Sequence, residues 1–141
     1  MGNYPEEIVA PMRAELVQAG FRQLMDASDV DSALRRPGLS LLVVNSVCGC
    51  AAAGARPGVI EALGRGLKFD QLLTVFAGME KDATQQAREY FEGAMPTSPQ
   101  AAILKDGQLV QLMQRHEFLD RHPVEIADRL QSAYEKAMAT S

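Results

Sequence analysis

Two cysteines separated by one glycine are the residues of this chain best suited to covalent chemistry. Cys48 and Cys50 follow an apolar, β-branched run over 39–47 and precede an alanine-rich segment that favours a helix. This order predicts a strand that turns into a helix at the cysteine pair. Unpaired N–H groups and the macrodipole at a helix N-terminus stabilise an anion, which lowers the pKa of a thiol placed there. The pattern therefore predicts a nucleophilic thiolate and thiol–disulfide exchange.

The residues around the cysteines have expected supporting roles. Asn45 and Ser46 end the strand, and we expect their side chains to shape the turn through local hydrogen bonds to the backbone, or to contact the thiols. Gly49 is expected to help the pair close by adopting backbone angles that other residues avoid. Two other interpretations of the pair stay open. In one the cysteines pack as small buried hydrophobes; in the other their thiolates hold a soft metal ion such as Cu(I).

Length and composition bound the fold and argue against several functions. The 141 residues suit a single domain over 1–141, and 47% hydrophobic with 23% charged residues is typical of a globular protein. A net charge of −4 without a basic cluster argues against nucleic-acid binding. No apolar run approaches the roughly 20 residues of a membrane span, and residues 1–7 lack the features of a signal peptide. We therefore expect no membrane association and a cytoplasmic location, where two cysteines are seldom a structural disulfide.

Alternating apolar patterns of strand and helix length predict an α/β fold with a mixed central sheet flanked by helices. The continuous apolar run over 39–47 is typical of a strand buried on both faces. Asp106-Gly107 between two apolar runs predicts a β-hairpin, which adds an antiparallel edge. We expect helices over 5–20, 28–36, 50–64, 82–93 and from 123 onward, and strands over 21–24, 39–47, 72–77, 101–104 and 109–113.

Local signals set the expected ends and bends of these helices. Ser28 or Asp29 is expected to cap the second helix, and Asp82 to open a capping box for the fourth. Gly93 is expected to end that fourth helix. Pro57, inside the helix that follows the cysteines, predicts a kink.

The order of the elements, with a cysteine pair at a helix start and an X-Pro loop before a hairpin, resembles the thioredoxin fold. Within that fold, the segment 43–52 (VVNSVCGCAA) followed by 55–57 (ARP) resembles the bacilliredoxin family. Similar segments lie along most of the chain, at 9–13 (VAPMR), 75–78 (VFAG), 88–91 (REYF), 98–99 (SP) and 115–117 (RHE). Cys-Gly-Cys in this setting is the specific part of the resemblance.

The resemblance implies a thiol–disulfide oxidoreductase that acts on mixed disulfides between cytosolic proteins and a low-molecular-weight thiol such as bacillithiol. By the family pattern Cys48 attacks, and Cys50 or a free small thiol resolves the adduct. The resemblance also implies a cis peptide bond at Ser98-Pro99, facing the cysteines, where it would present backbone groups to an extended substrate. The redox couple would be the cysteine pair itself, so no bound organic cofactor or metal is expected. Leu42 occupies the stretch where thioredoxins carry a buried carboxylate, which argues against a thioredoxin-style proton relay.

Two charged residues each have more than one interpretation. Arg56, about two turns beyond Cys48, forms an ion pair near the site, binds a substrate carboxylate, or is a solvated helix residue. His116 follows the hairpin and either covers the site and orients a substrate or is a surface or capping residue. Two alternative functions also stay open. One is a general disulfide isomerase or reductase, and the other is a non-redox Cys-x-Cys metal-binding module on the same fold.

A disulfide between Cys48 and Cys50 is expected to be relatively oxidising. Disulfides favour Cα separations of roughly 4.4–6.8 Å and a dihedral of about ±85–100°. Residues two positions apart reach that separation, but their small ring leaves the dihedral little freedom. Redox titration is therefore expected to give a reduction potential that is less negative than the value of about −270 mV for thioredoxin. A potential as reducing as that value would contradict this argument.

Overall fold

The sheet is built around the strand that leads to the cysteines. The computed structural model describes residues 2–139. Its strands are β1 (Arg22–Gln23), β2 (Leu39–Asn45), β3 (Gln71–Phe76), β4 (Gln100–Lys105) and β5 (Gln108–Met113). They are arranged in the order β1-β3-β2-β4-β5, with β1, β3 and β2 parallel and with β4 and β5 added by antiparallel pairing. The predicted mixed sheet is confirmed, although β2 ends two residues earlier than expected.

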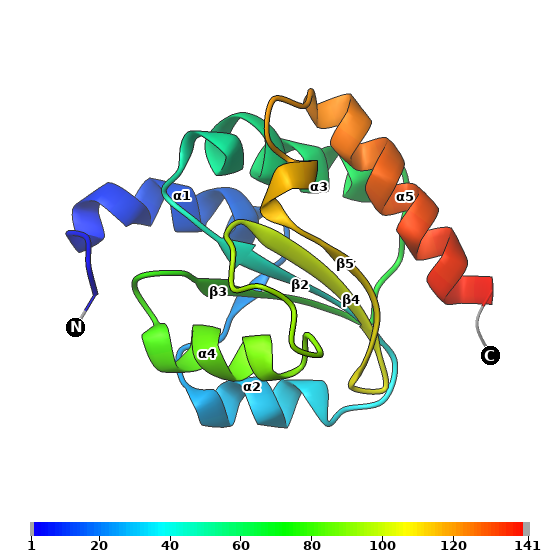
Figure 1. Ribbon diagram of the computed structural model, residues 1–141, viewed down its shortest axis with the longest axis horizontal. Coiled ribbons are helices and arrows are strands. Elements are labelled where there is room, and N and C mark those ends of the chain that lie inside the picture. The colour runs from blue at the N-terminus through cyan, green and yellow to red at the C-terminus, as the bar shows by residue number, and fades with distance from the viewer. Residues whose placement is uncertain (1, 140–141) are drawn as a thin grey trace.

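Helices cover both faces of the sheet (Figure 1). On one face lie α1 (Glu6–Gln18), α3 (Arg56–Gly64) and α5 (Pro123–Ala139), and on the other lie α2 (Ala27–Leu34) and α4 (Lys81–Glu89). All seven residues of β2 are buried between these layers. The layered arrangement explains why the sequence of β2 is apolar throughout rather than alternating.

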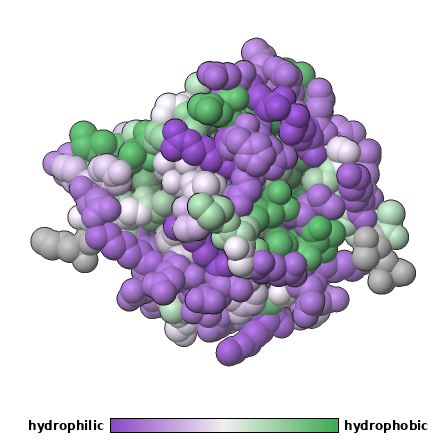
Figure 2. Space-filling model, viewed as in Figure 1, coloured by the Kyte–Doolittle hydropathy of each residue, from purple (hydrophilic) through white to green (hydrophobic). Residues whose placement is uncertain are grey.

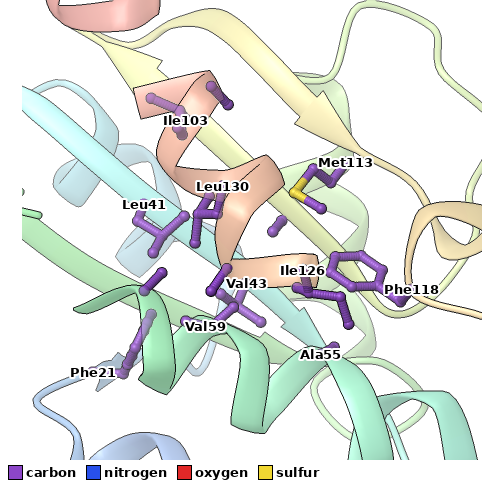
Figure 3. Packing of buried hydrophobic residues seen from close by; sticks show 14 of the residues in the cluster. Phe21, Leu41, Val43, Ala55, Val59, Ile103, Met113, Phe118, Ile126 and Leu130 are labelled. Carbon is purple, nitrogen blue, oxygen red and sulfur yellow. The ribbon is translucent and has the colours of Figure 1, made fainter. Parts of the chain in front are cut away.

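Alternate side chains of β2 enter two separate hydrophobic clusters, because successive side chains of a strand point to opposite faces. Leu41 and Val43 pack in the cluster with α3 and α5 (Figure 3). Leu42 and Val44 pack in the cluster with α2 and α4. Phe118 extends the first cluster to the segment that precedes α5 (Figure 3). The strand that ends at the cysteines is therefore held from both sides.

The face of the molecule shown in Figure 2 is mostly hydrophilic. A hydrophobic area on this face lies over the β4–β5 hairpin, where most side chains of β5 are only partly buried (Figure 2). Among the described residues, no helix is both long enough and apolar enough to cross a bilayer.

Short polar side chains and glycine set two of the local boundaries. Asp26 caps α2, rather than Ser28 or Asp29, because its extended backbone lets the side chain accept a hydrogen bond from the N–H of Asp29 at 2.8 Å. The hairpin turn is as predicted: Asp106 and Gly107 both adopt positive φ angles, of 52° and 78°. Two successive positive φ angles are what a tight two-residue hairpin turn requires.

The boundaries of α4 differ from the prediction at both ends. The helix begins one residue before Asp82, and the expected capping box is absent. The carbonyl of Glu80 instead accepts hydrogen bonds from the N–H and the hydroxyl of Thr84, at 2.9 and 2.8 Å. The helix also ends four residues before Gly93. Glu92 lies in the left-handed region with φ of 56°, so the chain has already turned away before the glycine.

The helix after the cysteines begins with a π-helical turn, η1 (Ala51–Ala55), and continues as α3. Pro57 is the second residue of α3. Proline has no N–H to donate, and its ring clashes with the carbonyl four residues earlier in a regular helix. A wider turn just before it relieves both problems. A π turn therefore precedes Pro57, and the kink expected from that proline stays a prediction.

Helices α3 and α5 approach closely at Gly58, where a Cβ atom would lie 2.5 Å from Cγ2 of Ile126. Gly58→Ala is therefore expected to lower the free energy of unfolding by about 1–3 kcal/mol in urea denaturation. Gly64→Ala, at the end of the same helix, is the matched control because a Cβ there meets no atom within 4 Å. That substitution is expected to be neutral or to stabilise by up to about 1 kcal/mol. Equal stability of the two variants would contradict the packing argument.

Candidate active site

Cys48 and Cys50 lie at the carboxyl end of β2, in the turn that leads into η1. Their Sγ atoms are 2.7 Å apart, and both cysteines are free and half-buried. The carbonyl of Cys48 accepts hydrogen bonds from the N–H groups of Ala51 and Ala52 at 3.1 and 3.3 Å, which begin the helical turns. The predicted position of the pair at a helix start is confirmed. The interpretation of the cysteines as fully buried hydrophobes is wrong.

Asn45 and Ser46 shape the turn as predicted. The Oδ1 atom of Asn45 accepts a hydrogen bond from the N–H of Ser46 at 2.8 Å, and its Nδ2 donates to the carbonyl of Met12 at 3.2 Å. The Oγ atom of Ser46 accepts from the N–H of Cys48 at 3.1 Å. The Ser46 side chain also helps to lower the pKa of the Cys48 thiol. One serine side chain therefore bonds the backbone of Cys48 and favours its thiolate.

Arg56 holds this turn in place through hydrogen bonds and is only 2% exposed. Its Nη1 donates to Oδ1 of Asn45 at 2.9 Å and to the carbonyl of Ser46 at 2.8 Å. Its Nε donates to Oε2 of Glu15 on α1 at 2.9 Å. A buried guanidinium needs a countercharge and hydrogen-bond acceptors, and these partners supply both. The ion pair near the site is thus present, and the interpretation of Arg56 as a solvated helix residue is wrong.

The pKa values of the two thiols are shifted in opposite directions. Burial raises the pKa of Cys48, but hydrogen bonds from Cys50, from Ser46 and from the N–H groups of Ala51 and Cys50 outweigh burial and leave that pKa below its ordinary value. Burial, the hydrogen bond to Cys48 and the charge of that thiolate raise the pKa of Cys50. The site therefore favours a negative charge on Cys48 and a proton on Cys50.

The segment after the hairpin contributes a different residue from the one expected. In the short 3-10 turn η2 (Arg115–Glu117), the charge of Arg115 reaches Cys50 and partly offsets the rise in the pKa of that thiol. His116 lies in the same turn and is exposed. This placement matches a surface residue rather than a cover for the site. Sequence reasoning missed Arg115 because only the fold decides which residue of the turn faces the cysteines.

The Ser98–Pro99 peptide bond is cis, as the resemblance implied. The carbonyl oxygen of Ser98 lies 3.9 Å from the Sγ atom of Cys48. Pro99 is buried and directly precedes β4, whereas Ser98 is half-buried. The loop therefore brings a backbone acceptor next to the sulfur of Cys48. Its contact with an extended substrate stays a prediction.

Gly49, between the two cysteines, is exposed and borders a hollow. Its φ angle is not in the left-handed region, so the expectation that it uses angles other residues avoid is wrong. A Cβ atom at this position would meet no atom within 4 Å. A hollow of about 250 Å³ lies beside the glycine, lined by Gly49, Cys50, Ala53, Gly54, Phe118, Leu119, Asp120 and Arg121. Neither a left-handed backbone nor a close contact therefore requires a glycine at this position.

Two further observations bear on the chemistry of the site. Leu42 is fully buried in the hydrophobic cluster with α2 and α4, so this position supplies no proton acceptor to the cysteines. Within residues 2–139, no three His, Cys, Asp or Glu side chains gather closely enough to hold a metal ion. A metal-binding interpretation would therefore depend on the two sulfur atoms alone.

Comparison with known proteins shows relatives over nearly the whole chain. A model of the family described as "Disulphide isomerase" matches residues 4–138. The chain is 46% identical over 130 residues to a bacilliredoxin of Geobacillus kaustophilus, covering 92% of this chain and 90% of that one. It is 44% identical over 133 residues to a bacilliredoxin of Staphylococcus epidermidis, covering 94% and 92%. It is 46% identical over 133 residues to a bacilliredoxin of Cytophaga hutchinsonii, covering 94% and 98%.

Solved structures share the fold at low sequence identity. A protein described as having a thioredoxin fold superposes with a TM-score of 0.64 at 16% identity, covering 82% of this chain and 95% of that one. The thioredoxin of Fasciola hepatica superposes with a TM-score of 0.54 at 19% identity, covering 82% and 98%. The fold, the cysteine pair and the sequence relatives together define a thiol–disulfide oxidoreductase of the thioredoxin fold. Within that class, the chain belongs to the bacilliredoxin family.

Removing the Ser46 hydroxyl is expected to raise the pKa of Cys48, because that hydroxyl stabilises the thiolate. Less thiolate is then present at neutral pH, so Ser46→Ala is expected to slow the alkylation of Cys48 by iodoacetamide severalfold. The rate is expected to recover at high pH, where both proteins are fully ionised. Ser28→Ala, at an exposed position in α2, serves as the control. An unchanged pH profile in Ser46→Ala would show that the hydroxyl does not support the thiolate.

Proposed function

We propose that this protein reduces mixed disulfides between proteins and a low-molecular-weight thiol such as bacillithiol. Cys48 is the attacking residue and Cys50 the resolving residue. The observation that carries the proposal is the half-buried pair with its sulfurs 2.7 Å apart and its pKa values shifted apart. The bacilliredoxin relatives support the same chemistry. A cytoplasmic location is part of the proposal, since the cytosol keeps such thiols reduced.

In the first step, the thiolate of Cys48 attacks the sulfur of the small thiol within the mixed disulfide. A new disulfide forms between Cys48 and the small thiol, the original disulfide breaks, and the protein client leaves as a thiolate that takes up a proton. The lowered pKa of Cys48 favours this step because the thiolate, not the thiol, is the nucleophile. The carbonyl of Ser98, 3.9 Å from the sulfur, is well placed to face the incoming client.

In the second step, Cys50 loses its proton and attacks the sulfur of Cys48, so that an intramolecular disulfide forms and the small thiol leaves as a thiolate. The first step prepares this one. Once Cys48 is part of a disulfide, its negative charge is gone, and with it two of the three causes that raise the pKa of Cys50. The charge of Arg115 then favours the Cys50 thiolate. Net, the client disulfide gains two electrons and the cysteine pair loses them, so a separate thiol reductant must restore the pair.

A second candidate function is general disulfide isomerisation or reduction, and the description of the matching family as "Disulphide isomerase" favours it. In isomerisation Cys48 attacks a client cysteine instead of the small thiol. The two functions differ in what they release. Refolding of a protein with scrambled disulfides tests isomerisation, whereas release of a small thiol from a modified client tests the main proposal.

Substitution of the cysteines one at a time tests the assigned roles. Cys48→Ser is expected to abolish release of the small thiol from a modified client protein, because the attacking atom is lost. Cys50→Ser is expected to release the client but to keep the small thiol on Cys48, seen by intact mass as a stable adduct. Unchanged release by Cys48→Ser, or an adduct carried on Cys50, would remove the basis of the assignment.

A further inference from the structure

The hollow beside the cysteine pair has the size of a small chemical group. It lies between the helix start at Gly49 and Cys50 and the segment 118–121, which Figure 1 shows in orange between η2 and α5. Its volume of about 250 Å³ is below the roughly 300–1,000 Å³ of pockets that enclose a drug-sized ligand. The hollow therefore suits one arm of a small molecule better than a segment of a protein client.

Arg121 lines the hollow, and its guanidinium includes a buried hydrogen-bond donor without a partner in the described part of the chain. The Nε atom of Arg121 is buried, and it has no hydrogen-bond acceptor among the described residues. Buried polar groups in folded proteins nearly always have a partner, so an orphaned guanidinium nitrogen calls for an acceptor. A guanidinium is suited to bind a carboxylate, which it can hold with two parallel hydrogen bonds.

The charges around the hollow also favour an anion. Arg115, on the neighbouring turn, is exposed, and its charge reaches Cys50. Asp120 lines the hollow and opposes the two arginines. The nearby carboxylate of Glu117 is already engaged by the N–H of Gln114 at 2.8 Å and by Arg129 at 3.4 Å. Apart from the thiolate of Cys48, Arg121 and the nearby Arg115 against Asp120 give this region a positive balance.

We propose that this hollow is a subsite for a carboxylate carried by the small thiol of the mixed disulfide, with Arg121 and Arg115 as its specificity-determining residues. The inference deepens the proposed function and depends on it. Gly49 and Cys50 both line the hollow, so it lies directly beside the cysteine pair. While the carboxylate is held there, the thiolate of Cys48 attacks the sulfur of the small thiol, the old disulfide breaks, and its other half leaves as a thiolate. The subsite therefore acts on the capture step.

The test measures capture alone, in a Cys50→Ser background in which the adduct on Cys48 is stable. The probes are three small symmetric disulfides: dithiodipropionate, which carries carboxylates, hydroxyethyl disulfide, which is neutral, and cystamine, which carries ammonium groups. Intact mass follows adduct formation with time. Arg121→Gln and Arg115→Gln are each expected to slow capture of dithiodipropionate by about fivefold relative to capture of hydroxyethyl disulfide, the size of one partly exposed charge interaction. Asp120→Asn is expected to speed capture of dithiodipropionate.

Matched variants separate the subsite from general effects of charge or folding. Arg36→Gln makes the same change in charge at an exposed position before β2, at the opposite end of the strand from the cysteines, and is expected to change no rate. Arg121→Lys keeps the positive charge and is expected to retain part of the preference for dithiodipropionate over hydroxyethyl disulfide. Arg115 and Asp120 are exposed, so their variants test the proposal even if Arg121→Gln is unstable.

The outcomes distinguish this inference from the proposed function. Equal slowing of all three probes by the arginine variants, or no slowing of any, would overturn the subsite while leaving the function intact. Failure of Cys48 to form an adduct with any probe would instead overturn the proposed function. A mixed disulfide between mercaptoethanol and an acidic peptide tests the source of the carboxylate. Slower capture of that peptide adduct by Arg121→Gln would place the recognised carboxylate on the client and contradict the inference.

Discussion

The hydrogen bond between the two sulfur atoms is the interaction on which the site depends. Cys48 and Cys50 lie 2.7 Å apart, so a negative charge on one is stabilised by the proton of the other. Burial alone would raise the pKa of both thiols and leave the pair unreactive. Sharing one proton instead favours a thiolate on Cys48 and a thiol on Cys50. The chemistry of the pair therefore depends on which of the two sulfur atoms carries the negative charge at each stage.

The turn places the negative charge on Cys48 because its hydrogen-bond donors converge on the sulfur of that residue. The Ser46 hydroxyl and the N–H groups at the helix start stabilise a charge on Cys48. Arg56 holds the turn in place through Asn45 and the carbonyl of Ser46, and Glu15 ties Arg56 to α1. These hydrogen bonds join the end of β2, the start of α3 and α1 next to the cysteine pair. Asn45, Ser46 and Arg56 are buried, whereas Gly49 and Cys50 border the hollow.

Much of the fold could be predicted from the sequence because apolar periodicity and turn chemistry are local. The central strand, the hairpin at Asp106-Gly107 and the position of the cysteines at a helix start all follow from neighbouring residues. The partners of the cysteines could not be predicted in the same way. Glu15 meets Arg56 across 41 residues, and Arg115 approaches Cys50 only because the hairpin returns the chain to the end of β2. Such contacts are products of topology, and no local pattern encodes them.

The most direct test of the account is a titration of the two thiols in the reduced protein, followed by thiolate ultraviolet absorbance and by peptide mapping after brief alkylation. The account predicts two separate ionisation steps. The pKa of one lies below, and the pKa of the other above, the value of about 8.5 for an ordinary cysteine. In the step with the lower pKa, the alkylation label is expected on Cys48. Cys48→Ser is predicted to lose the low step. Two thiols that ionise together at the ordinary value, or a first label on Cys50, would contradict the central claim.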